Sequence, residues 1–137
     1  MTKINSIAVI GAGAVGTFYG GKLVKAGFTV QFQSRFMFTS KTKKMHVKSA
    51  CGNFEFPIQV YPDVNLMDKA DLIIVSAKTC NPQEDLTHYS NLIRKIRKQG
   101  SIILVLQNGI NMEEKLGKVF PDNPILGGLA FTCINRI

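Results

Sequence analysis

Short apolar runs recur along the chain, each bounded by glycine or by polar residues. The four strongest cover residues 4–10, 71–77, 102–106 and 125–131, and a fifth run at 28–33 alternates apolar residues with glutamines. Apolar runs of this length are typical of strands that are buried on both faces of a parallel sheet. The pattern therefore predicts five strands.

Between these runs, apolar residues recur at the spacing of a helix. Residues 14–26 predict one helix, and Gly27 is placed to end it in a left-handed conformation. A second helix is predicted after Asn81, where Glu84 is positioned to reach back to the first turn. Gly100 is the residue expected to end this second helix.

Four basic residues crowd the end of the second predicted helix: Arg94, Lys95, Arg97 and Lys98. They look at first like a nucleic-acid-binding patch. Placement in the last turns of a helix explains them more simply, because the negative end of the helix dipole attracts cations. We therefore predict that they stabilise the end of this helix.

Two other segments complete the pattern. In residues 41–61, short apolar stretches flank a turn signal at 51–53, which predicts a small antiparallel excursion instead of a crossover helix. Residues 62–69 have room for only a short helix, and a third full helix is predicted after Asn111. Because strands and helices otherwise alternate, the predicted fold class is α/β, with an open sheet.

The composition suits one globular domain covering residues 1–137, with 45% hydrophobic residues. Three cysteines without CxxC spacing argue against a disulfide scaffold or a metal site, and they favour a reducing compartment. The apolar neighbours of Cys80 and Cys133 predict small core residues. No apolar run approaches the roughly 20 residues of a membrane span, and residues 4–10 read as a first strand of a cytoplasmic protein.

The net charge of +8 is unevenly distributed, because no Asp or Glu precedes Glu55 while eight Lys and Arg residues do. This basic first part would attract a polyanion, either a nucleic acid or a phosphorylated cofactor. A solvated basic surface is the alternative explanation. Nucleic acid is the less favoured partner, because the chain lacks basic residues interleaved with aromatic ones and lacks any recognised binding motif.

A glycine motif follows the first predicted strand and opens the first predicted helix: Gly11-Ala12-Gly13-Ala14-Val15-Gly16, which matches G-x-G-x-x-G. Gly11 permits the tight turn, Gly13 lets the backbone approach a pyrophosphate, and Gly16 lets the helix pack closely on the strand. The amides of Ala14 and Val15 then face the phosphates from the positive end of the helix dipole. The motif predicts dinucleotide binding in a Rossmann-like fold; a glycine turn that serves packing alone is the alternative.

The residues after the second predicted strand indicate which dinucleotide is bound. An NAD site places an Asp or Glu about 20 residues after the glycines to hold the ribose hydroxyls. Residues 31–35 contain no acid, whereas Arg35 can pair with a 2′-phosphate. The predicted cofactor is therefore NADP(H). Lys41, Lys43 and Lys44 either reinforce this contact or are bystanders on the surface.

The chain resembles the ketopantoate reductase (2-dehydropantoate 2-reductase) family. The resemblance rests on residues 7–16, on Asp71 to Lys78 and on Leu106-Gln107-Asn108-Gly109, and the antiparallel segment at 52–57 is also similar. The strand-end lysine together with the Gln-Asn-Gly turn is the distinctive part. The resemblance covers essentially the whole chain but corresponds only to the N-terminal cofactor domain of that family. It implies a mostly parallel Rossmann-like sheet with helices on both faces.

Lys78 and Asn108 both follow predicted buried strands, so they should emerge at the carboxyl edge of the sheet, where such folds bind ligands. By resemblance, these two residues hold the nicotinamide ribose and the substrate side of the cofactor, and Arg35 holds the adenosine phosphate. Backbone near Ile134 is a further contact. Taken singly, Lys78 is also explained as a solvated strand-end lysine and Asn108 as a turn residue.

The resemblance also implies an activity that is divided between two domains. Family members reduce a 2-keto acid such as ketopantoate with NADPH, in pantothenate biosynthesis, and their general-acid lysine lies on a helical C-terminal domain. This chain ends at Ile137, before such a domain, so no catalytic residue is assigned and binding of the keto acid is expected only with the missing domain. The surface facing that domain should be partly apolar, which would allow self-association. The alternative is a freestanding NADP(H)-binding sensor or regulatory module without catalysis.

Overall fold

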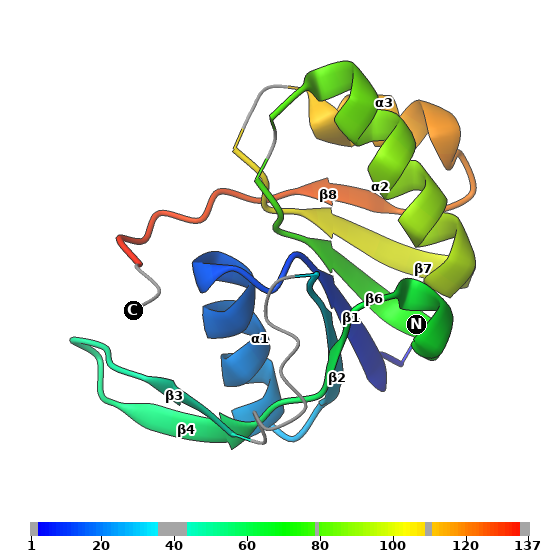
Figure 1. Cartoon of the computed structure of the whole chain (residues 1–137). Coiled ribbons are helices and arrows are strands. Elements are labelled where there is room, and N and C mark those ends of the chain that lie inside the picture. The colour runs from blue at the N-terminus through cyan, green and yellow to red at the C-terminus, as the bar shows by residue number, and fades with distance from the viewer. Residues whose placement is uncertain (1–2, 36–43, 79, 109–110, 135–137) are drawn as a thin grey trace.

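The computed structural model describes residues 3–35, 44–78, 80–108 and 111–134. Its centre is a six-stranded sheet in which every pairing is parallel and the strand order is β5-β2-β1-β6-β7-β8 (Figure 1). The strands are β1 (Ser6–Ile10), β2 (Thr29–Gln33), β5 (Val60–Tyr61), β6 (Ala70–Val75), β7 (Arg97–Val105) and β8 (Ile125–Gly127). The Rossmann-like α/β class predicted from the sequence is confirmed.

Helices cover both faces of this sheet. Helix α1 (Ala14–Lys25) lies on one face, and α2 (Pro82–Ile96), α3 (Met112–Val119) and the 3-10 turn η1 (Val64–Leu66) lie on the other (Figure 1). A hydrophobic core lies on each face of the sheet, and alternate residues of β1 belong to each core. Ile7 and Val9 pack on the α1 side, and Ala8 and Ile10 pack on the α2 side. This two-sided burial explains why β1 is apolar at successive positions.

The antiparallel excursion is a separate two-stranded sheet made of β3 (Lys44–Val47) and β4 (Phe54–Pro57). It packs on α1 through Phe56, whose ring lies where a side chain at Gly21 would project. The ring centroids of Phe56 and Phe32 are 6.0 Å apart, so the small sheet shares the core of the large one. The predicted excursion extended to residue 61, but Val60–Tyr61 form β5, which pairs in parallel with β2 in the main sheet.

The junction between α2 and β7 differs from the prediction. Helix α2 ends at Ile96, so Arg97 and Lys98 belong to β7, and Gly100 lies within that strand with a φ of 77°. The pairing of β6 with β7 is irregular here, because Ala70 pairs with Arg97 but Leu72 pairs with Ile102. The left-handed glycine serves this bulge and not the end of the helix.

Smaller differences concern a helix start and the last strand. The side chain that caps the start of α2 is that of Asp85, and not that of Glu84. Its carboxylate accepts hydrogen bonds from the amides of Cys80 and Asn81 at 2.7 and 2.9 Å. Strand β8 ends at Gly127, four residues earlier than predicted, and Leu129 and Phe131 beyond it are almost fully exposed. Helix α3 begins after Asn111 as predicted, with no cap from the Asn111 side chain.

Candidate functional site

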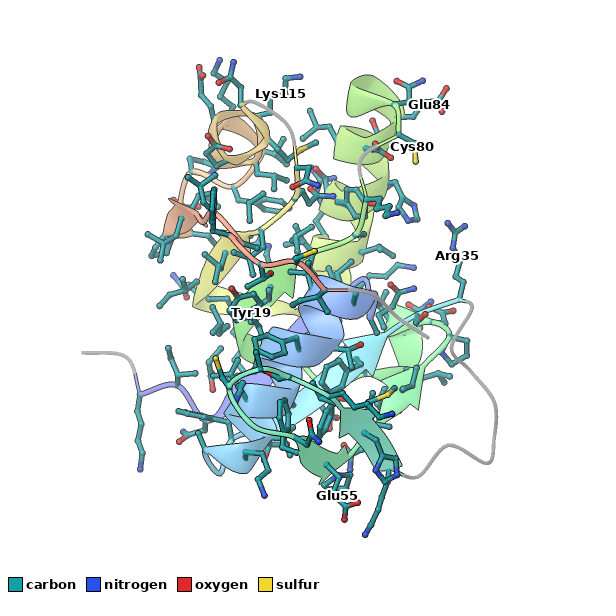
Figure 2. All side chains as sticks on the ribbon, turned by 90° about the vertical axis from the view of Figure 1, so that its left-hand side faces the viewer. Tyr19, Arg35, Glu55, Cys80, Glu84 and Lys115 are labelled. Carbon is teal, nitrogen blue, oxygen red and sulfur yellow. The ribbon has the colours of Figure 1, made fainter. Side chains whose placement is uncertain are left out.

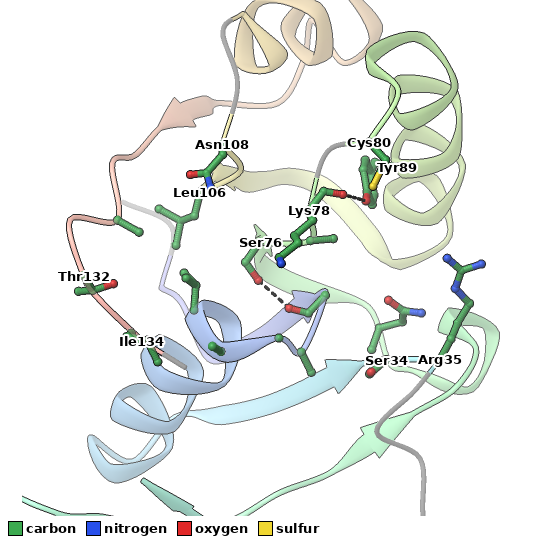
Figure 3. Close-up of a pocket in the computed structure, with 18 of the residues that line it drawn as sticks. Ser34, Arg35, Ser76, Lys78, Cys80, Tyr89, Leu106, Asn108, Thr132 and Ile134 are labelled. Atoms are coloured by element: carbon green, nitrogen blue, oxygen red, sulfur yellow. Dashed lines mark hydrogen bonds between the residues drawn. The ribbon is translucent and has the colours of Figure 1, made fainter. Parts of the chain in front are cut away.

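A cavity of about 800 Å³ lies at the carboxyl ends of β1, β6 and β7 (Figure 3). The chain leaves β1 toward β2 on one side, whereas β6 pairs with β1 on the other side. The cavity therefore sits where the strand order reverses. In open parallel sheets, this reversal point is where ligands bind.

The glycine turn forms the floor of this cavity. Gly11 has a φ of 88°, and a Cβ at this position would lie 2.5 Å from backbone atoms of Ala77, so both the turn and the close approach of β6 require glycine. Nothing lies within 4 Å of the position that a Cβ on Gly13 would occupy. The turn is thus tightly packed at Gly11 and open toward the cavity at Gly13.

The first turn of α1 supplies backbone donors at this point. Gly13 precedes the helix without a side-chain cap, and no acidic residue lies in the first turn. The amides of Gly11 and Ala12 donate to the Gln33 carbonyl at 3.2 and 3.0 Å, so they hold the turn against β2. The amides of the first helical residues have no partner within the helix, and the positive end of the dipole there favours an anion.

Gly16, the last glycine of the motif, is placed differently from the other five residues. Gly11, Ala12, Gly13, Ala14 and Val15 all line the cavity, and Gly16 does not. A Cβ on Gly16 would lie 2.4 Å from both the Gly11 carbonyl oxygen and the Ser76 hydroxyl. The structure thus places Gly16 at the close contact between α1 and the strand ends.

The three polar residues singled out in the sequence all line the same cavity. Arg35 follows β2, Lys78 follows β6 and Asn108 follows β7. Arg35 and Asn108 lie at opposite sides of the cavity, and Lys78 lies between them (Figure 3). Residues more than 70 positions apart in the chain are therefore brought to one site.

The lining carries positive charge from Arg35 and Lys78, and none of the described residues that line the cavity is Asp or Glu. Figure 2 shows Arg35 projecting from the sheet on the side where Cys80 precedes α2, with Glu55 at the far end of the molecule. The Asp85 carboxylate near this edge is engaged by two backbone amides. The cavity therefore favours a ligand with negative charge.

Tyr89 is a cavity residue that the sequence pattern does not reveal, because helical spacing places it among the apolar positions of α2. It is 6% exposed, and its hydroxyl donates to the Lys78 carbonyl at 3.3 Å. Burial raises the pKa of Tyr89, and the nearby Asp85 raises it further. The His88 ring packs edge-on against Tyr89 and also lines the cavity. Only the position of α2 above the strand ends, which is a tertiary feature, brings these two residues into the site.

The segment after β8 forms another wall. Alternate residues face the cavity, namely Ala130, Thr132 and Ile134, whereas Leu129 and Phe131 are exposed. Ile134 was expected near the cofactor, and it does line the cavity. The core positions predicted for Cys80 and Cys133 are wrong, because both residues are exposed. Apolar neighbours in sequence do not bury a residue when the segment lies on the outside of the sheet.

Two further observations concern the part of the chain that is described. Its His, Cys, Asp and Glu side chains form no group of three or more that could hold a metal ion. Within the same residues, no helix combines the length and the apolar character needed to cross a membrane.

Comparison with known proteins assigns the family. The pattern of the family described as "Ketopantoate reductase PanE/ApbA" matches residues 7–137, nearly the whole chain. The chain belongs to the ketopantoate reductase family. Within this family, the chain corresponds to the N-terminal domain, which here has the glycine turn, Lys78 and Asn108 around one cavity.

Relatives in other organisms are similar over most of this chain. The 2-dehydropantoate 2-reductase of Nostoc sp. is 38% identical over 95% of the chain, which spans 40% of that relative. The protein of the same name from Pyrococcus abyssi is 30% identical over 80% of this chain, and the match covers 35% of that relative's length. The chain thus covers well under half the length of these relatives.

Solved structures agree with this assignment. The crystal structure of 2-dehydropantoate 2-reductase from Geobacter metallireducens superposes with a TM-score of 0.84 at 35% identity, covering 96% of this chain and 43% of that one. A ternary structure of D-mandelate dehydrogenase with NADH and anilino(oxo)acetate has a TM-score of 0.72 at 24% identity, covering 90% of this chain and 40% of that one. The second likeness shows a shared fold alone.

Proposed function

We propose that this chain is the NADP(H)-binding domain of a 2-dehydropantoate 2-reductase-like oxidoreductase. The observation that carries the proposal is the cavity at the reversal of strand order, with the glycine turn as its floor and Arg35 and Asn108 at opposite sides. A dinucleotide is an elongated ligand with phosphates in the middle. It matches a cavity that has backbone donors in the middle and polar side chains at both ends.

The residues present fit this cofactor. The open space at Gly13 leaves room for a pyrophosphate, and the first-turn amides of α1 would hold it. Arg35 would hold the 2′-phosphate through its guanidinium, at a position where a carboxylate would repel that phosphate. Lys78 and Asn108 would hold the nicotinamide ribose and orient the nicotinamide toward the substrate side.

The proposed reaction is transfer of a hydride to the carbonyl carbon of a 2-keto acid such as ketopantoate. NADPH, when bound, supplies that hydride. The described residues of this chain bind and orient the cofactor, and we assign none of them as the acid that protonates the carbonyl oxygen. We therefore propose that the keto acid is bound and reduced only together with a further domain, and that the chain is inactive alone. A cytoplasmic location remains part of the same proposal.

The test is a calorimetric titration of the chain with NADPH and with NADH. We expect tighter binding of NADPH by about one to two orders of magnitude, because a charge-assisted contact is worth roughly 1.5 to 3 kcal/mol. Arg35→Glu should abolish this preference. Lys48→Glu is the matched control, because it makes the same change of charge at an exposed residue that does not line the cavity. Equal affinities in the parent chain, or an unchanged preference in Arg35→Glu, would exclude the assignment.

A further inference from the structure

Side-chain hydrogen bonds tie the loop that carries Lys78 to three neighbouring parts of the fold. The Ser76 hydroxyl donates to the Gly11 carbonyl at 2.8 Å, the Gln107 amide nitrogen donates to the Ala77 carbonyl at 2.9 Å, and the Tyr89 hydroxyl donates to the Lys78 carbonyl at 3.3 Å. Each of these three consecutive residues is thus tied by at least one hydrogen bond, and the Ser76 hydroxyl also lies 3.3 Å from the Ile10 carbonyl. The bonds from Ser76 and Tyr89 link the loop to the glycine turn and to α2 (Figure 3). The bond from Gln107 links it to the segment that follows β7.

The bond from Gln107 joins the two strand ends that carry Lys78 and Asn108. Gln107 is 9% exposed and directly precedes Asn108, and its amide nitrogen reaches across to the residue before Lys78. The other amide atom of Gln107, Oε1, is buried and has no hydrogen-bond partner among the described residues. A side chain that leaves a buried acceptor unpaired lowers stability. Packing alone would be served as well by an apolar residue of the same size.

Tyr89 fixes the same loop from the helical layer. Its ring is buried, and its hydroxyl reaches the backbone of Lys78 itself. The Lys78 side chain extends from this point into the cavity (Figure 3). A lysine side chain is long and flexible, and it loses conformational entropy when it binds a ligand. A backbone that is already fixed lowers the total entropy cost of that binding.

We propose that Gln107 and Tyr89 are positioning residues, which hold the loop 76–78 so that Lys78 and Asn108 reach the same bound cofactor. This inference rests on the proposed function, because it takes NADPH to be the ligand of Lys78. Gln107 does not line the cavity, whereas Tyr89 does, so a direct contact with the cofactor is open to Tyr89 alone. An effect that passes through Lys78 disappears in the Lys78→Ala background, whereas an effect of direct contact persists there, which makes the inference testable.

The test is a double-mutant cycle on NADPH affinity. Tyr89→Phe removes only the hydroxyl, and Gln107→Met removes both amide atoms at similar size. Each is made alone and together with Lys78→Ala, and affinity is measured by calorimetry. Tyr61→Phe is the matched control, because it removes a hydroxyl from a tyrosine that does not line the cavity. Melting temperatures and the fluorescence of bound NADPH are recorded for every variant.

We expect each single variant to weaken NADPH binding about three- to tenfold, the range of a lost neutral hydrogen bond. In the Lys78→Ala background the same changes should have almost no further effect. Both single variants should alter the fluorescence of bound NADPH, with melting temperatures near the parent's. Tyr61→Phe should change neither affinity nor fluorescence.

Four other outcomes would overturn parts of this interpretation separately. Equal losses in the parent and Lys78→Ala backgrounds would exclude positioning through Lys78 and leave the proposed function standing. Unchanged affinity in both single variants would do the same. If the parent binds NADPH but Lys78→Ala binds it equally well, the role of Lys78 and this inference both fail. If the parent does not bind NADPH, the proposed function itself fails.

Discussion

At the scale of single residues, the three glycines of the turn meet different physical demands. Gly11 combines a left-handed φ with contact to the Ala77 backbone, Gly13 faces open space, and Gly16 is packed against oxygen atoms of Gly11 and Ser76. One sequence motif therefore contains a conformational requirement at Gly11, open space at Gly13 that the proposed function gives to the phosphates, and a packing requirement at Gly16. Substitution by alanine separates the last two.

Gly16→Ala should destabilise the fold by about 1–3 kcal/mol, because the new methyl group has no space and the turn must shift. Gly13→Ala should leave stability near the parent's and weaken NADPH binding, because its methyl group points into the space proposed for the phosphates. Urea denaturation and NADPH titration of both variants provide the check. A parent-like free energy of unfolding for Gly16→Ala, or parent-like affinity for Gly13→Ala, would contradict this division.

Lys78→Ala and Asn108→Ala should each weaken NADPH binding without unfolding the domain. Both residues line the cavity at the open edge of the sheet, so neither side chain supports the core. Thermal melting and calorimetry together decide the matter. A large fall in melting temperature with unchanged affinity would show that the residue in question serves the structure instead.

The sequence predicted these cavity residues because each follows an apolar strand, and parallel strands end at a common edge. It did not predict the contacts of Tyr89 or of Gln107, although Gln107 belongs to the Gln-Asn-Gly turn on which the resemblance rests. Periodicity places Tyr89 on the buried face of α2 but says nothing about its hydroxyl, and the bond from Gln107 depends on the spacing of β6 and β7. Contacts of this kind arise only when separate elements pack together.

At the scale of elements, the boundary between α2 and β7 shows why helix ends are hard to predict. The basic residues between positions 94 and 98 would all be favourable in the last turns of a helix, but the helix stops at Ile96. The Arg97 guanidinium lies over the Phe120 ring, 5.4 Å from its centroid, and donates to the Asn123 side chain at 2.9 Å. These partners follow α3 or end it, so the signal that ends α2 comes from a distant part of the chain. The strands β1, β2 and β6 were predicted to within two residues, because two-sided burial is visible locally.

A carboxylate joins three strands at the opposite edge of the sheet. Asp71 of β6 accepts hydrogen bonds from the Asn5 and Ser6 amides at 3.0 Å each, and it pairs with Lys98 of β7 at 2.6 Å. The Asp71 side chain is 12% exposed. The Lys98 ammonium, followed by the two amides, holds the pKa of Asp71 well below its usual range.

Asp71→Asn should therefore lower the free energy of unfolding at neutral pH, by about 1–3 kcal/mol for a partly exposed pair with several hydrogen bonds. A carboxyl with a depressed pKa in the folded state stabilises the fold fully above its unfolded value of about 3.9, and this stabilisation is lost as the pH falls toward the folded value. The difference between parent and variant should thus shrink below about pH 4. Urea denaturation at several pH values measures it, with the exposed Asp122→Asn as control. A difference that is independent of pH would contradict the assignment.

At the scale of the whole molecule, the apolar residues beyond β8 leave a surface uncovered. Leu129 and Phe131 are almost fully exposed, and Leu126 in the edge strand β8 is 52% exposed. We expect the chain to self-associate through this surface, because exposed apolar side chains grouped along one segment favour association. Sedimentation at increasing concentration should reveal a larger species in the parent. The double variant Leu129→Ser and Phe131→Ser should remain monomeric, whereas Leu66→Ser, at an exposed leucine elsewhere, should behave as the parent. A monomeric parent would contradict this expectation.

Whether the isolated chain can catalyse a reaction also depends on the whole molecule. In the proposed function the cavity binds and orients NADPH, but reduction of a ketone also requires that the ketone is held against the nicotinamide and that its oxygen is protonated. The described residues of this chain have been assigned to neither task. Positioning and general-acid catalysis each contribute large factors to rate, commonly many orders of magnitude together. The isolated chain should therefore bind NADPH and show no measurable reduction of ketopantoate.

A spectrophotometric assay of NADPH oxidation with ketopantoate checks this last expectation, and the longer 2-dehydropantoate 2-reductase of Nostoc sp. serves as the positive control. NADPH binding without turnover would agree with a cofactor domain that depends on a further domain for its substrate. Saturable turnover by the purified chain would contradict it and would require an acid within this chain. Tyr89 and Lys78 would then be the first candidates, because both line the cavity and carry exchangeable protons. Comparing the pH profiles of Tyr89→Phe and Lys78→Ala would identify which of them protonates the substrate.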